Sequence, residues 1–216
     1  SIINTGQVFY RSDTGDMKVT LNVLGTGAWA SGGALNTGRQ NLGGNGTQTA
    51  ALVFGGSTGG ETELYNGTAW TELADLNTDR SYVRGLGVST AALCAAGITP
   101  PSTRVALVES WDGSSWTEVN DLNQIRRSGH AIGTTAAGLY FAGNIPPNTG
   151  KTESWNGTSW TEVNDLNTAR DALGGGGTAA LGLAAGGQPG PGIQVESWDG
   201  TSWTETTDMN AKKVSH

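Results

Sequence analysis

Aromatic, acidic and basic positions recur along the chain with a period of roughly 43 residues. Five tryptophans mark the period, at spacings of 41, 46, 44 and 43 residues: Trp29, Trp70, Trp116, Trp160 and Trp203. An asparagine follows each tryptophan by seven positions, and a basic residue follows it by ten: Arg39, Arg80, Arg126, Arg170 and Lys213. In four units a second large aromatic residue precedes the tryptophan by five positions, and a glutamate stands two positions before that: Glu63, Glu109, Glu153 and Glu196. The pattern indicates a protein built from repeats of one structural unit.

Each unit contains signals for four short strands, here named a to d in chain order. A glycine-rich stretch such as 171–177 follows the basic residue and predicts strand a, which must lie close to other backbone. An apolar run such as 51–56 predicts strand b. After a variable loop, Asn-Gly or Asp-Gly between aromatic and polar residues predicts the hairpin of strands c and d, as in 153–163.

Four-stranded units of this length bury their faces by stacking on one another. Radial stacking gives a β-propeller, with the small residues of strand a near the axis and the tryptophans further out. We therefore predict an all-β fold in which residues 1–216 form a single propeller domain of five blades. The predicted blades are 39–73, 80–119, 126–163, 170–206, and 6–35 combined with 210–216.

The last of these blades is the predicted site of ring closure. Residues 6–11, 17–23 and 28–35 supply its strands b, c and d, and the C-terminal residues supply strand a. Closure would remove the exposed strand edges that promote aggregation. The alternative is that the chain is a fragment of a ring with six or seven blades.

Composition and charge narrow the classes of partner. The chain has 35 glycines among 216 residues, which argues against a mainly helical protein, and its formal net charge is −7. An acidic chain without a basic block predicts no nucleic-acid binding. The apolar runs are too short for a membrane span, so we expect no membrane insertion.

The repeat resembles the kelch repeat. The resemblance is carried by a Gly-Gly doublet after strand b, an aromatic residue in strand c, a tryptophan in strand d and an arginine after a leucine-containing link, and it covers about residues 25–216. The doublet is weakened to Ala-Gly at 96–97 and 142–143. The segments 6–19, 46–56 and 160–170 are also similar to kelch-like segments of structural and tail-fibre proteins of marine bacteriophages.

The sequence contains no set of residues typical of a catalytic site. Two histidines, His130 and His216, are too few for a metal site, and Cys94 lies in an apolar strand as a small buried residue would. Nucleophile, metalloprotease and phosphate-loop motifs are missing from the sequence. We expect no cofactor, no metal and no enzymatic activity. The repeated glutamates and arginines are interpreted as structural partners of one another or of backbone carbonyls.

The loops between strands b and c vary most between units and share a face with the links between strands d and a. Variable loops on a rigid scaffold are typical binding sites. The polar residues that we select there are Thr99, Ser102, Arg104, Asn144, Asn148, Lys151, Gln188 and Gln194. We predict a binding or display module that recognises a protein or glycan on a cell surface, located in a virion or outside the cell. The alternatives are a purely structural virion component and a multivalent lectin.

Overall fold

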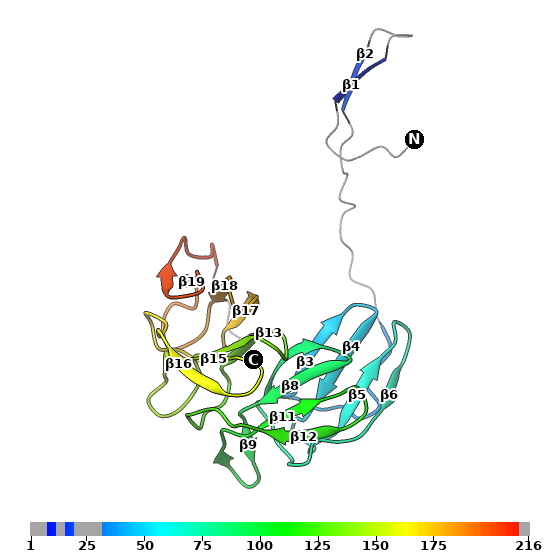
Figure 1. Ribbon diagram of the computed structural model, residues 1–216, viewed down its shortest axis with the longest axis vertical. Coiled ribbons are helices and arrows are strands. Elements are labelled where there is room, and N and C mark those ends of the chain that lie inside the picture. Colours follow the sequence, from blue (N-terminus) through cyan, green and yellow to red (C-terminus); the bar gives the residue numbers. More distant parts are fainter. Residues whose placement is uncertain (1–7, 12–15, 20–31, 212–216) are drawn as a thin grey trace. The chain divides into compact units, whose positions relative to one another are not determined.

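The structure is a computed structural model that describes residues 8–11, 16–19 and 32–211 (Figure 1). The chain divides into two compact units, residues 1–32 and 33–216. In the first unit, β1 (Val8–Arg11) and β2 (Asp16–Val19) form an antiparallel hairpin. No helix in the described residues is long and apolar enough to cross a membrane.

The second unit contains four sheets, each with four antiparallel strands in the order a, b, c, d. Blade 1 consists of β3 (Gly43–Thr47), β4 (Ala50–Phe54), β5 (Thr62–Tyr65) and β6 (Trp70–Glu72). Blade 2 consists of β7 (Arg84–Val88), β8 (Ala91–Ala95), β11 (Val108–Trp111) and β12 (Trp116–Val119). Blade 3 consists of β13 (His130–Gly133), β14 (Gly138–Phe141), β15 (Thr152–Trp155) and β16 (Trp160–Val163). Blade 4 consists of β17 (Gly174–Gly177), β18 (Gly182–Ala185), β19 (Val195–Trp198) and β20 (Trp203–Glu205).

The inner strands of the four blades lie side by side in chain order: β3 beside β7, β7 beside β13, and β13 beside β17. The arrangement is that of a β-propeller, as the repeat predicted (Figure 1). A further small hairpin, β9 (Ile98–Thr99) and β10 (Thr103–Arg104), lies within the b–c loop of blade 2.

The prediction of five blades is wrong for the described residues, which contain four. The predicted fifth blade combined 6–35 with 210–216, but β1 and β2 pair only with each other, in a two-stranded sheet. Trp29, Lys213 and most of that blade lie outside the described residues. A tryptophan and a link at the repeat spacing mark a repeat, but by themselves they do not predict the four strands of a blade.

Neighbouring blades pack through apolar residues of strand b on one blade and the tryptophans of the next. Between blades 1 and 2, Leu52 and Phe54 pack with Trp111 and Trp116, and all four are at most 5% exposed. The Phe54 and Trp116 rings meet edge to face at 4.9 Å between centroids. The same kind of cluster joins blade 2 to blade 3 and blade 3 to blade 4.

A buried polar network holds each d–a link to the blade that follows it. In blade 2, the Glu109 carboxylate accepts hydrogen bonds from the Arg80 guanidinium at 2.8 Å and from the Asn77 backbone N–H at 2.7 Å. Arg80 also donates to the carbonyls of Ala96 and Leu107. The other three blades repeat the ion pair, as Arg39–Glu63, Arg126–Glu153 and Arg170–Glu196. Because these carboxylates are buried and fully engaged, they fix the links rather than serve as acid catalysts.

Candidate functional site

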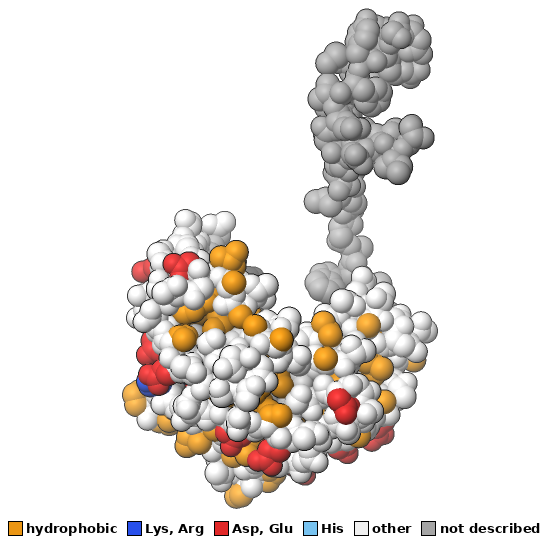
Figure 2. All heavy atoms as spheres, viewed as in Figure 1, with side chains coloured by type: hydrophobic (Ala, Val, Ile, Leu, Met, Phe, Trp, Pro, Cys, Tyr) orange, Lys and Arg blue, Asp and Glu red, His pale blue; other side chains and the backbone are white. Residues whose placement is uncertain are grey.

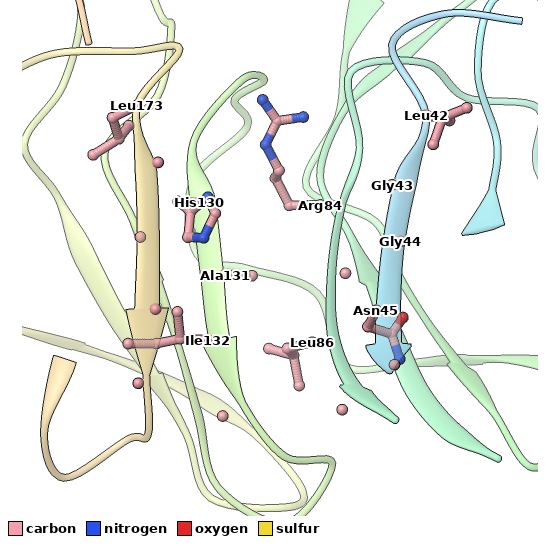
Figure 3. Close-up of a pocket in the computed structure, with 18 residues that line it drawn as sticks. Leu42, Gly43, Gly44, Asn45, Arg84, Leu86, His130, Ala131, Ile132 and Leu173 are labelled. Atoms are coloured by element: carbon pink, nitrogen blue, oxygen red, sulfur yellow. The ribbon is translucent and has the colours of Figure 1, made fainter. Parts of the chain in front are cut away.

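The four inner strands surround a cavity of about 690 Å³ on the propeller axis (Figure 3). Its walls run along nearly the whole length of the inner strands, over 42–46, 84–87, 130–133 and 173–177. Most of these positions are glycine, so the backbone itself forms much of the surface. Asn45, Arg84 and His130 supply the polar side chains of the wall.

Arg84 and His130 occupy the same register position on neighbouring strands, because each pairs with the last residue of its strand b. The Arg84 guanidinium reaches toward the end of the cavity marked by Leu42 and Leu173 (Figure 3). Its Nε donates to the carbonyl of Gly129 at 2.8 Å. Burial, assisted by the charge of Arg84, lowers the pKa of His130 to about 4. The imidazole is therefore neutral at pH 7, and arginine is the cationic group of this cavity.

The cavity opens onto the face that carries the b–c loops and the d–a links. Four equivalent link residues have left-handed backbone there: Asn41, Tyr82, Ser128 and Ala172. Backbone hydrogen bonds join them in series, from Tyr82 N to Asn41 O, from Ser128 N to Tyr82 O, and from Ala172 N to Ser128 O. We call the hollow of about 570 Å³ that these links surround the channel mouth.

The b–c loops are attached to the links beside the mouth by paired backbone hydrogen bonds. Such bridges connect Arg127 with Asn144 and Asp171 with Gln188. A third bridge, between Ser81 and Ile98, holds the loop of blade 2. The loops and the links therefore form one continuous surface.

Side chains from three blades form one polar network on this surface. The Asn144 side-chain carbonyl accepts from Arg104 Nη2 at 2.7 Å and from Arg127 Nε at 3.4 Å. The Asn144 amide donates to Asn148 Oδ1 at 2.6 Å. The Asn148 amide donates to Asp171 Oδ1 at 2.9 Å and to the Gln188 carbonyl at 2.8 Å. Arg127 also lies 4.7 Å above the ring of Tyr82, a cation–π contact that orients its guanidinium.

Positive charge collects at this site although the chain as a whole is acidic. Between residues 33 and 211, four arginines are taken up by the buried glutamate pairs. The remaining basic residues of that stretch are Arg84, Arg104, Arg127 and Lys151. The first three belong to the mouth and its network, and none of them forms an ion pair with another described residue.

The structure brings together four of the residues selected from the sequence and separates the other four. Arg104, Asn144, Asn148 and Gln188 meet in the polar network. Lys151 pairs with Glu162 of strand d, and the backbone carbonyl of Gln194 accepts from Gly186 N. Thr99 lines a separate hollow with Pro100 and Pro101, and Ser102 is exposed in the β9–β10 turn.

Tyr82, Arg84, Arg127 and Asp171 are site residues that sequence reasoning missed. They follow the repeated arginines by one, two or four positions, within or just after the d–a links, from which no binding residue was selected. The signal was present, because the first two positions after the repeated arginine hold a different residue type in each unit while the flanking Arg and Asn recur. Variation inside a repeated link marks exposed positions as clearly as variation in a loop does.

The remaining residues considered for catalysis or metal binding are Cys94 and His216. Cys94 is fully buried, and this burial raises the pKa of its thiol to about 12, so the thiolate is not formed at neutral pH. His216 lies outside the described residues. Within the described parts of the chain, no group of three or more histidine, cysteine, aspartate or glutamate side chains is placed to hold a metal ion.

Comparison with known proteins identifies the fold. No protein-family model and no curated protein matches the sequence. Among solved structures, 218 chains match. One is the "Structure of YjhT", with a TM-score of 0.70 and 10% sequence identity, over 83% of this chain and 68% of that chain. The β-propeller fold is thereby established, while the kelch and bacteriophage resemblances stay predictions from the sequence.

The prediction that the chain is not an enzyme is corrected by the same match. That prediction was inferred from missing catalytic motifs. A fold shared with the YjhT propeller at 10% identity shows that this scaffold tolerates almost complete replacement of its sequence. The fold by itself does not decide function, so a catalytic role stays among the functions that the fold allows.

Proposed function

We propose that the propeller unit is a binding module and that its ligand, a protein or glycan on a cell surface, is held at the channel mouth. The observation that supports this most strongly is the polar network joining the b–c loops and links of blades 2, 3 and 4. Amide, guanidinium and carboxylate groups converge there beside the ring of Tyr82. Concave sites with a few convergent polar groups are the usual form of ligand sites.

The network also supports a preorganised site. Each amide of Asn144 and Asn148 is engaged by neighbouring groups, so the side chains that face the ligand are fixed before it binds. Preorganisation reduces the entropy cost of binding. The similarity of repeat segments to bacteriophage structural and tail-fibre proteins supports placing this module on a virion or another surface-exposed assembly.

Replacing Arg127 by alanine tests the proposal. The variant removes a guanidinium that has no described carboxylate partner, so little fold stability is lost beyond a cation–π contact of about 0.5–1 kcal/mol. We expect at least a tenfold loss of binding to a panel of marine bacterial cells and to an array of immobilised bacterial-surface glycans.

Lys151→Ala is the matched control. It removes one positive charge from the same blade, but Lys151 is paired with Glu162 away from the mouth. We expect it to bind as the wild type does. Pretreating cells with protease or with periodate separates a protein ligand from a glycan. Equal binding by wild type and Arg127→Ala, or loss only in Lys151→Ala, would reject this site. Binding by neither wild type nor variants would favour a purely structural role.

A further inference from the structure

The three interfaces between blades bury the same positions. We call the side of a blade that meets the next blade its leading face, and the side that meets the previous blade its trailing face. The leading faces of blades 1 to 3 present a leucine of strand b that is at most 1% exposed: Leu52, Leu93 and Leu139. The trailing faces of blades 2 to 4 present two tryptophans each, at most 5% exposed: Trp111, Trp116, Trp155, Trp160, Trp198 and Trp203.

Within the described residues, no further blade covers either terminal face of the series, although Trp70 Nε1 on the trailing face of blade 1 donates to the Gly33 carbonyl at 3.0 Å. On the leading face of blade 4, Leu183 holds the position of those buried leucines and is 50% exposed, and Leu181 in the adjacent turn is 67% exposed. Figure 2 shows hydrophobic side chains gathered over this part of the molecule. On the trailing face of blade 1, Tyr65 and Trp70 hold the tryptophan positions and are only half-buried.

The backbone contacts between neighbouring blades also end at these two faces. The hydrogen-bond series around the mouth runs from Asn41 to Ala172 and contains no bond between those two residues. The inner strand β17 contacts β13 on one side, while β3 contacts β7. Each terminal face thus lacks the neighbour that its equivalents have.

We propose that these faces form an interface between copies of this chain, with the leading face of blade 4 docked on the trailing face of blade 1 of a second copy. The contact would continue an interface that the molecule already makes three times, with leucine covered by an aromatic pair. Every copy carries one face of each kind, so the required partner is always present. Different patches meet in such a heterologous contact, and it closes into a ring or extends into an open chain of subunits.

Two variants of the full chain, each damaging one face, test the interface. Leu183→Glu places a carboxylate on the leading face, and Tyr65→Glu places one on the trailing face. Ile125→Glu is the control, because Ile125 is equally exposed, at 52%, but lies in a d–a link off both faces. Leu181→Glu changes the leading face at a more exposed position and provides a second variant if Leu183→Glu unfolds.

Sedimentation velocity over a hundredfold range of concentration measures the association, with far-UV circular dichroism as the check on folding. We expect wild type and Ile125→Glu to associate, and each face variant alone to be monomeric. An equimolar mixture of Leu183→Glu and Tyr65→Glu should form a dimer, because one intact face remains on each. A monomeric wild type would overturn the proposal. Dissociation by Ile125→Glu, or a mixture that stays monomeric, would overturn it as well.

Discussion

At the scale of single residues, one hydrogen bond distinguishes the three blade interfaces. Trp116 Nε1 donates to Thr62 Oγ1, and Trp203 Nε1 donates to Thr152 Oγ1, both at 3.0 Å. The equivalent Trp160 Nε1 is buried without a partner, because Val108 stands where the other two interfaces have threonine. An unsatisfied buried donor costs about 1–3 kcal/mol.

Val108→Thr should therefore stabilise the protein by about 1 kcal/mol, since threonine has the shape of valine and supplies the missing acceptor. Thr152→Val is the reverse change and should destabilise it by a similar or larger amount, because it leaves Trp203 Nε1 unpaired. Urea unfolding followed by tryptophan fluorescence measures both. If both substitutions lowered the midpoint equally, the missing hydrogen bond would not explain the difference between the interfaces.

His130 makes stability depend on pH. The unfolded chain takes up a proton near pH 6.5, whereas the folded chain resists it until about pH 4. More protons are bound by the unfolded state in this window, so stability falls as pH decreases from about 6.5 to 4. The loss is roughly 2 kcal/mol between pH 7 and pH 4.5. In His130→Phe this part of the loss should disappear, and identical pH profiles of unfolding free energy would contradict the assignment.

At the scale of elements, strand a of each blade is matched to strand b of the blade before it. A Cβ on Gly85 would come within 2.6 Å of the Phe54 ring, and a Cβ on Gly175 within 2.9 Å of the Phe141 ring. Blade 2 ends its strand b with the smaller Ala95, and the facing position of blade 3 is Ala131. One interface thus places a ring against a glycine, and the next places alanine against alanine.

Gly85→Ala should cost about 1–3 kcal/mol by overpacking, and Phe54→Ala about 3–5 kcal/mol by leaving a cavity. The double variant reproduces the alanine pair of the next interface. Its cost should be at least 1 kcal/mol less than the sum of the single costs. Chemical denaturation of wild type, the two single variants and the double variant gives the double-mutant cycle. Strictly additive costs would show that the side chains at positions 54 and 85 do not compete for the same space.

The sequence determined the strands of blades 1 to 4 well, because Asn-Gly and Asp-Gly turns and alternating aromatics are local signals. The Asp112 carboxylate, for example, accepts from the backbone N–H groups of Ser114 and Ser115 inside one turn. The site was predicted only in part. Arg104, Asn144, Asn148 and Gln188 were found as loop residues, but Tyr82 and Arg127 reach the mouth through left-handed links whose geometry arises from contacts between blades.

At the scale of the whole molecule, the repeat predicted the propeller but not the number of blades. Stacking follows from any unit with two apolar faces, whereas the count depends on which segments complete a sheet. Residues near Trp29 carry repeat markers, yet the described residues before blade 1 form only the β1–β2 hairpin. Among the described residues, the same stacking leaves a leading and a trailing face without a neighbouring blade, and it gathers the b–c loops on one surface.

The central claim is that this surface binds the ligand, and an exchange of loops tests it most directly. In one full-length chain, loops 98–107 and 144–151 are replaced by 57–61 of blade 1. The exchange keeps one backbone contact of each loop, because the backbone carbonyls of Glu61, Leu107 and Lys151 all accept from the N–H of the residue after strand b. In the control chain, the opposite face is changed by Ser114→Ala, Thr158→Ala and Thr201→Ala. Binding to the bacterial panel should be lost in the first chain and kept in the second; retention in the first, or loss only in the second, would contradict the account.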